Sequence, residues 1–146
     1  MKNNKGKKAK TLYTLITVAT FWFFAVASSE EEDVGDKEPS IEITAKQLVK
    51  EYADNEVSAD NKYKGKVLLV TGTIDDIGKD LVDDIYVAMG ESSFTGFEDG
   101  FGVQCFFSDK HKKEVGNLKK GDSIKIKGKC DGVLGYVHLM GCQIVK

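Results

Sequence analysis

Three cysteines and two histidines are the residues best suited to covalent or metal chemistry: Cys105, Cys130, Cys142, His111 and His138. An odd number of thiols allows at most one intramolecular disulfide. Zinc binding by these thiols with His138 would call for paired C-x-x-C spacing, which the sequence lacks. No Ser, Cys or Asp stands at a recognisable catalytic spacing from either histidine, and no Gly-rich phosphate loop is present. The sequence therefore predicts no catalytic residue, no metal site and no cofactor.

Carboxylates are concentrated between Asp75 and Asp84, where the sequence DDIGKDLVDD contains five Asp. Such oxygens could gather a hard cation such as Ca²⁺, but this spacing matches no known binding loop. A solvated loop is the simpler interpretation.

Basic and acidic residues are distributed unevenly along the chain. All 23 Asp and Glu follow residue 28, whereas five of the 21 Lys precede it, so the rest has 16 Lys and a net charge of −7. The sequence has no Arg. Because Lys and Arg supply most of a protein's affinity for phosphate backbones, this composition counts against nucleic acid as a partner.

Residues 1–27 have the layout of a secretory signal peptide, with a Lys-rich start, an apolar run over residues 11–27 and a small-residue end. The bulky sequence FWFF at residues 21–24 leaves an uncleaved membrane anchor as the alternative. No cysteine lies near the predicted cleavage site, which excludes a bacterial lipoprotein anchor. In both cases we expect the domain to be exported, either to the periplasm or to the extracellular space.

Residues 28–40 are polar and acidic and contain the only proline, so we expect an acidic linker there. The folded domain is predicted to span residues 41–146. It begins with a helix, for which Thr44 is a suitable N-cap and Gln47 completes a capping box. The apolar residues at i, i+3, i+4 and i+7 form one face of this helix: Ala45, Leu48, Val49 and Tyr52.

Five later segments have the alternating or short apolar patterns of strands. Gly72, inside the first and longest segment, marks an expected bend, and Gly141 marks an expected bulge in the last. Ser108, after the third, can cap a short helix. The segments are Lys64–Ile77, Ile85–Met89, Gly102–Phe107, Ser123–Cys130 and Tyr136–Val145.

This order of elements predicts an all-β fold with small helices. We expect a five-stranded OB-fold Greek-key barrel, preceded by an N-terminal helix and with a helix between strands three and four. A meander sandwich is the rival, but five strands are few for a sandwich and the inter-strand helix fits it poorly.

Several stretches carry a more specific pattern: TAKQLVKEYADNEVSADNKYKGKVLLVTGTI, VQCFF, LKKGDSIKIKGKCDG and LMGCQIV. With these, residues 41–146 resemble the tRNA-anticodon-binding-like family of OB-fold proteins. The matching pairs include Glu51-Tyr52, Asn55-Glu56 and Ala59-Asp60. The resemblance implies an OB-fold in an exported or membrane-attached protein. It implies no agreed activity and no catalytic residues.

All three cysteines face the barrel interior in this strand assignment. In an OB barrel the fifth strand lies beside both the third and the fourth, so Cys142 could form a disulfide with Cys130 or with Cys105. Cys130 is slightly favoured. Three reduced core cysteines are the alternative.

OB-folds bind ligands over strands two and three and between the loops that follow strands one and four. The residues that we expect there are Asp75, Asp76, Tyr86, Phe94, Phe97 and Phe106, although Phe94 and Phe97 could instead fold back over the barrel mouth. Asp beside aromatic rings suits a cationic, peptide or sugar ligand.

We therefore predict an exported, non-enzymatic binding module whose partner is an envelope protein or a small ligand. It would be attached to the membrane through residues 11–27 if these are not cleaved. Single-stranded nucleic-acid binding is the alternative, and it rests on fold analogy alone.

Overall fold

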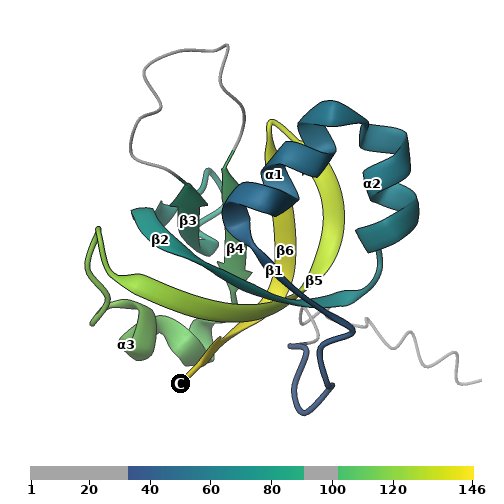
Figure 1. Ribbon diagram of the computed structural model, residues 1–146. Coiled ribbons are helices and arrows are strands. Elements are labelled where there is room, and N and C mark those ends of the chain that lie inside the picture. Colours follow the sequence, from purple (N-terminus) through teal and green to yellow (C-terminus); the bar gives the residue numbers. More distant parts are fainter. Residues whose placement is uncertain (1–32, 91–101) are drawn as a thin grey trace, which may run out of the picture.

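The computed structural model describes residues 33–90 and 102–146. Their order begins with one short strand and two helices, after which strands predominate (Figure 1). The elements are β1 (Ile41–Thr44), α1 (Ala45–Asp54), α2 (Glu56–Tyr63), β2 (Val67–Lys79), β3 (Ile85–Gly90), β4 (Val103–Phe107), the 3₁₀ turn η1 (Asp109–His111), α3 (Lys112–Val115), β5 (Ser123–Leu134) and β6 (Tyr136–Val145).

Strands β2 to β6 close a barrel in the order β2-β3-β4-β6-β5, because β5 pairs back onto β2. The β4–β6 pair is parallel and the other pairs within the barrel are antiparallel. This is the topology of an OB-fold, and it confirms the predicted five-stranded barrel with a helix between its third and fourth strands. Figure 1 shows α1 and α2 together at one end of the barrel and α3 at the opposite side.

Strand β2 is long because it pairs with two barrel strands, one along each half of its length. Residues 67–73 pair with β5 and residues 73–79 pair with β3. The change of register lies between Ile74 and Asp76, a bulge two residues beyond the bend that was expected at Gly72. Gly72 has another role, because a Cβ there would lie 3.0 Å from Ala45 Cβ and 3.1 Å from Met89 Sδ. Its missing side chain lets α1 approach the barrel.

Two elements were not anticipated. Residues 41–44 form β1, which runs parallel to β2, and residues 56–63, between the expected first helix and the first long strand, form helix α2. The expected cap of α1 is present, with the Gln47 N–H donating to Thr44 Oγ1 at 3.2 Å. Asn55 caps α2 in the same way, since its Oδ1 accepts from the Ser58 N–H at 3.0 Å.

Two strands extend further than expected, to Lys79 in β2 and to Leu134 in β5, because their backbones continue to pair with β3 and β6. The loop after β2 is therefore only residues 80–84. The helical turn after β4 begins at Asp109, but the Ser108 hydroxyl makes no capping hydrogen bond. Gly141 has φ +60°, and the β5–β6 register shifts beside it, in agreement with the predicted bulge.

The core consists of the inward-facing side chains of the barrel strands and the side chains that close its two ends. From α1, Leu48 and Tyr52 are buried against the barrel, and Val115 of α3 is buried at the other end. The fully buried strand residues include Leu68, Val70, Val87, Met89, Val103, Ile126, Val137 and Leu139.

Residues 33–40, within the predicted acidic linker, contact the barrel. Val34 is buried and its N–H donates to the carbonyl of Gly141 at 2.9 Å, while Lys127 Nζ donates to the carbonyl of Gly35 at 2.7 Å. Part of this stretch is therefore attached to the folded domain.

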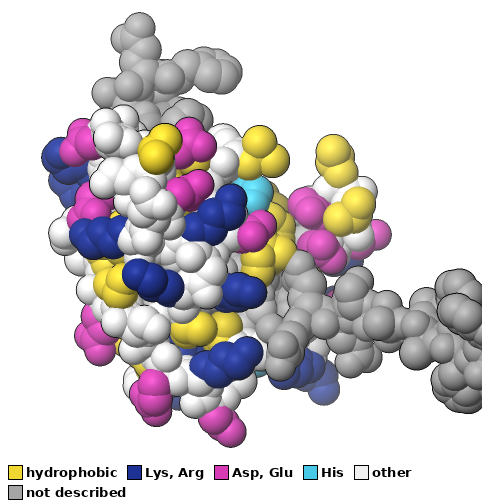
Figure 2. Space-filling view, turned by 90° about the vertical axis from the view of Figure 1, so that its right-hand side faces the viewer, with side chains coloured by type: hydrophobic (Ala, Val, Ile, Leu, Met, Phe, Trp, Pro, Cys, Tyr) yellow, Lys and Arg dark blue, Asp and Glu magenta, His cyan; other side chains and the backbone are white. Residues whose placement is uncertain are grey.

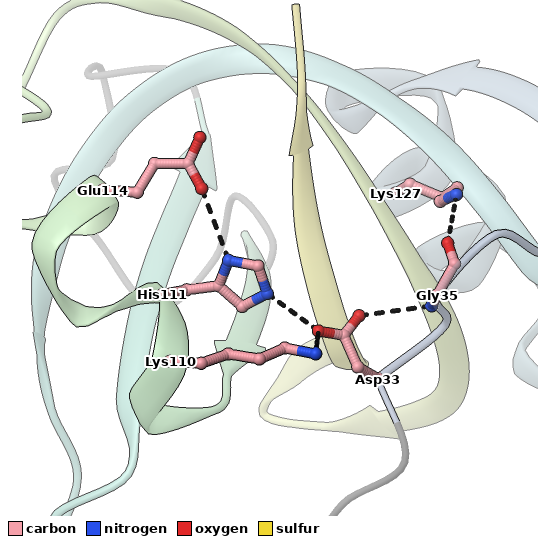
Figure 3. A network of polar contacts seen from close by, with 6 residues as sticks. All are labelled: Asp33, Gly35, Lys110, His111, Glu114 and Lys127. Carbon is pink, nitrogen blue, oxygen red and sulfur yellow. Dashed lines mark hydrogen bonds and ion pairs between the residues drawn. The ribbon is translucent and has the colours of Figure 1, made fainter.

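The carboxylate of Asp33 is at the centre of this attachment (Figure 3). It accepts hydrogen bonds from Lys110 Nζ at 2.7 Å and from His111 at 2.8 Å, and the other His111 nitrogen faces Glu114 at 3.3 Å. Burial alone would raise the pKa of Asp33, but the hydrogen bonds from Lys110 and His111 outweigh it and lower this pKa.

Candidate ligand-binding face

Aromatic rings gather on the outer face of β3, β4 and β6. Alternate residues of these strands point out of the barrel, and Tyr86 pairs directly with Phe106 across β3 and β4. Their ring centroids are 6.4 Å apart, and the next centroid, that of His138 on β6, is 5.3 Å from Phe106. Both ring pairs meet edge to face, the arrangement that the ring quadrupoles favour. The three rings form one continuous row, which we call the ring row.

Glycines beneath two tyrosines allow these rings to lie close to the strands. A Cβ at Gly78 would be 2.9 Å from the Tyr86 hydroxyl, and a Cβ at Gly102 would be 3.3 Å from the Tyr136 ring. Tyr136, at the start of β6, thereby borders the ring row, and the rings of both tyrosines remain partly exposed. Phe106 in the middle of the row is only 7% exposed.

Asp76 fixes the hydroxyl end of Tyr86. Its Oδ2 accepts from the Tyr86 hydroxyl at 2.9 Å and its Oδ1 is 2.5 Å from Lys120 Nζ. Lys120, with the Tyr86 hydroxyl, lowers the pKa of Asp76 against the effect of burial, and the bond to Asp76 raises the pKa of Tyr86. Asp76 is therefore ionised and Tyr86 neutral near pH 7.

His138 is neutral near pH 7 as well. Burial lowers its pKa, and the nearby Asp131 acts in the opposite direction with a smaller effect. A neutral imidazole beside Phe106 extends the ring row as an uncharged surface.

Exposed apolar side chains lie on the two loops beside the ring row. Leu81, with 105% relative exposure, and Val82 lie in the β2–β3 loop, and Leu134 and Tyr136 flank the turn between β5 and β6. Figure 2 shows a projecting group of hydrophobic and acidic side chains at the upper right, the composition of the β2–β3 loop. It also shows Lys and acidic side chains interspersed over the face in view.

The structure brings together three of the six residues predicted to bind ligand: Asp76, Tyr86 and Phe106. Asp75 is exposed in β2 beside them. Phe94 and Phe97 lie outside the described residues. His138 and Tyr136 also lie on this face, although neither was among the predicted binding residues. The alternation of β6 could have revealed them, because both are at positions that point out of the barrel.

The three cysteines are free and buried. The thiol of Cys130 is 3.4 Å from the Tyr52 hydroxyl, whereas Cys142 interacts with the thiol of Cys105. Burial raises the pKa of both Cys130 and Cys142, so neither thiol is activated as a nucleophile. The disulfide between Cys130 and Cys142 stays a prediction.

Several residues of the family pattern join the two N-terminal helices to each other. Glu51 Oε2 accepts from the Tyr63 hydroxyl at 2.6 Å and from Lys62 Nζ at 2.7 Å. The Tyr52 hydroxyl donates to Asp60 Oδ1 at 3.1 Å. These groups join α1 to α2, and we call them the helix clasp. They are remote in the sequence from the ring row and have a structural role.

The part of the chain that the structure describes has neither a metal-binding cluster nor a membrane-spanning helix. Among residues 33–90 and 102–146, no three His, Cys, Asp or Glu side chains are grouped so as to hold a metal ion. Within the same residues, no helix is long and apolar enough to cross a membrane.

Comparison with known proteins identifies the family. The tRNA_anti-like family model matches residues 5–144, almost the whole chain. The chain belongs to this family. No curated protein matches it. Among solved structures, a candidate nucleic acid-binding lipoprotein from Klebsiella pneumoniae is 22% identical, with a TM-score of 0.57 over 72% of this chain and 91% of its own. At this identity the likeness supports the OB-fold alone.

These comparisons contradict the expectation that nucleic acid is a poor partner. The family is named for its similarity to tRNA-anticodon-binding domains, and the Klebsiella lipoprotein is described as a candidate nucleic-acid binder. The expectation was wrong because it rested on the total charge of the chain. Single-stranded nucleic acids are also held by base stacking on aromatic rings, which total charge does not report.

Proposed function

We propose that this protein binds single-stranded nucleic acid through the ring row. The observation that supports the proposal is the contiguous set of Tyr86, Phe106 and His138, bordered by Tyr136, on the OB-fold face that commonly binds oligonucleotides. A base that stacks on an exposed ring such as Tyr86 or Tyr136 can gain about 1–3 kcal/mol of binding free energy. The domain acts as a binding module, without catalysis.

The charge of the protein determines how this binding should depend on salt. The chain after residue 28 has 16 Lys, no Arg and 23 acidic residues. We therefore expect few phosphate contacts, and hence a shallower dependence of affinity on salt than a basic OB-fold would show. Stacking would supply most of the affinity.

We also propose that the domain acts outside the cytoplasm. The signal-like residues 1–27 support this location, and the solved neighbour is described as a lipoprotein. This chain has no cysteine before Cys105 to accept a lipid, so its attachment would use residues 11–27 themselves. Intact mass and N-terminal sequencing of the native protein distinguish cleavage from anchoring.

Fluorescence anisotropy with labelled single-stranded oligonucleotides tests the nucleic-acid proposal. We expect binding that weakens roughly 5- to 100-fold per ring in Tyr86→Ala and Tyr136→Ala. Val57→Ala is the matched control, because Val57 is an exposed apolar residue of α2, outside the ring row. The absence of binding at low salt, or an equal loss in the control, would overturn the proposal.

A further inference from the structure

Asp76 is the charged side chain in direct contact with the ring row. It follows the β-bulge in β2, and its Cα partner is Ala88 of β3, next to the Tyr86–Phe106 pair. Its side chain is 42% exposed. A ligand stacked on Tyr86 would therefore meet this carboxylate at the edge of the ring.

The Tyr86 ring is held from three sides. The hydroxyl donates to Asp76, the ring lies against Gly78, and the ring of Phe106 lies 6.4 Å away. Since the hydroxyl end is fixed, the position of Asp76 relative to a base on this ring is also fixed. This arrangement can distinguish bases by their edges.

An ionised carboxylate accepts about four hydrogen bonds and donates none. Three acceptor positions of Asp76 are used by the Tyr86 hydroxyl, Lys120 Nζ and the backbone N–H of Ile77. The remaining position can accept an N–H group from a ligand. Adenine and cytosine present an exocyclic amino group on the edge where thymine and uracil present a carbonyl oxygen. An amino group would pair with Asp76, and a carbonyl oxygen would be repelled by it.

The neighbouring carboxylates of the β2–β3 loop are engaged within that loop. Asp80 Oδ1 accepts from the backbone N–H groups of Val82 and Asp84, and Asp83 pairs with Lys79 at 3.1 Å. The side chain of Asp83 is 85% exposed. These groups contribute negative charge near the face, without the fixed contact to a ring that Asp76 has.

We propose that Asp76 is a specificity-determining residue of this face, which selects single-stranded segments whose bases carry an amino group at C4 of a pyrimidine or C6 of a purine, that is cytosine or adenine, over thymine and uracil. The inference rests on the proposed function of nucleic-acid binding. It adds the base preference and the residue that determines it.

The experiment compares labelled oligo(dC), oligo(dA) and oligo(dT) of equal length at one salt concentration. We expect the first two to bind roughly 5- to 100-fold more tightly than oligo(dT), the range of one hydrogen bond to a charged group or one base contact. Asp76→Asn keeps an oxygen for the Tyr86 hydroxyl and adds an N–H donor. The preference for oligo(dC) should therefore disappear or reverse toward oligo(dT).

Asp83→Asn is the matched control, because it removes the same charge from the adjacent loop. It should strengthen binding to all three oligonucleotides equally and leave the preference unchanged. Tyr86→Phe keeps the ring for stacking and removes the hydroxyl that positions the carboxylate, so it should leave binding to oligo(dT) nearly unchanged and reduce the preference. This second variant tests the inference even if Asp76→Asn unfolds.

The possible failures are distinguishable. If no oligonucleotide binds, the proposed function fails and the inference fails with it. If all three bind with equal affinity, or if Asp76→Asn behaves as Asp83→Asn does, the function stands and the role of Asp76 is refuted.

Discussion

Two pairs of tyrosines in this protein have opposite roles. In the helix clasp, Tyr52 and Tyr63 are buried, with centroids 6.3 Å apart, and each hydroxyl is bonded to a carboxylate. On the ligand-binding face, Tyr86 of the ring row and the neighbouring Tyr136 lie over glycines and remain partly exposed. Residue type alone does not separate these roles. The two pairs differ in burial: Tyr52 and Tyr63 are covered by the core, whereas Tyr86 and Tyr136 rest on glycines and keep part of each ring in solvent.

The helix clasp and the ring row also differ in how far they coincide with the family pattern. The helix clasp contains several residues of the family pattern, and it joins α1 to α2. The ring row lies only partly within that pattern, because Phe106 belongs to the VQCFF stretch whereas Tyr86 and His138 lie outside the matching stretches. We infer that the family pattern records mainly the architecture, and that Tyr86 and His138 make the ligand face particular to this chain.

The largest expected effect is on the helix clasp. Tyr63 is 1% exposed, so Tyr63→Ala should reduce the free energy of unfolding by about 3–5 kcal/mol, the usual cost of truncating a buried aromatic side chain. Urea denaturation measures this loss. Oligonucleotide affinity should persist wherever the variant is folded, and loss of binding by folded protein would break the proposed separation of the two regions.

Substitutions of Gly72, which lies against the start of α1, and of Gly78, which lies against Tyr86, should affect stability and binding to different extents. Gly72→Ala would press a Cβ against Ala45 and Met89 in the packed core, at a cost of about 1–3 kcal/mol in stability. Gly78→Ala would press on the hydroxyl end of the partly exposed Tyr86 ring and not on the packed core, so we expect weaker oligonucleotide binding with a smaller change in stability. Thermal unfolding and anisotropy on both variants check this. Equal destabilisation of the two would contradict the comparison.

Removal of a single hydroxyl from the helix clasp should have a smaller effect. Tyr52→Phe removes the hydroxyl that donates to Asp60 and faces the Cys130 thiol. The expected loss is about 1 kcal/mol in the free energy of unfolding, the net value of one buried hydrogen bond. Oligonucleotide affinity should not change. A weakening of binding at unchanged stability would place Tyr52 in the ligand site.

The smallest expected effect is the pH dependence that arises from His138. Burial lowers its folded-state pKa, so the unfolded chain, with a histidine pKa of about 6.5, binds the proton more readily. The contribution of His138 to stability is therefore present above about pH 6.5 and is lost as pH falls through the folded-state pKa. Comparison of wild type with His138→Gln by urea denaturation at pH 7.5 and pH 5 measures it. A steeper pH dependence in the variant would contradict this assignment.

The sequence predicted the main strands and the topology well because their signals are local. Thr44 capped its helix, and the alternation in Ser123–Cys130 placed Ile124 and Ile126 inward as found. A bend was expected at Gly72 because the sequence could not show that this glycine faces α1. Strand β1 was missed because its pairing partner, β2, begins 23 residues later.

The ligand face was predicted only in part for a related reason. Asp76, Tyr86 and Phe106 were found because they flank or occupy the strands that OB-folds use. His138 was considered only as a catalytic or zinc-binding residue. Its contact with Phe106 depends on the parallel pairing of β4 with β6, which brings together residues 32 positions apart in the chain.

By itself, the sequence determined the number and order of the barrel strands, the first helix and the acidic, Arg-free composition. These follow from local periodicity, capping residues and residue counts. Only the tertiary structure decided that Tyr86, Phe106 and His138 form one row, that Asp76 holds its end, and that the family-pattern tyrosines form a clasp. The physical reason is that closure of the barrel sets distances between strands, and these distances depend on pairing register across the chain.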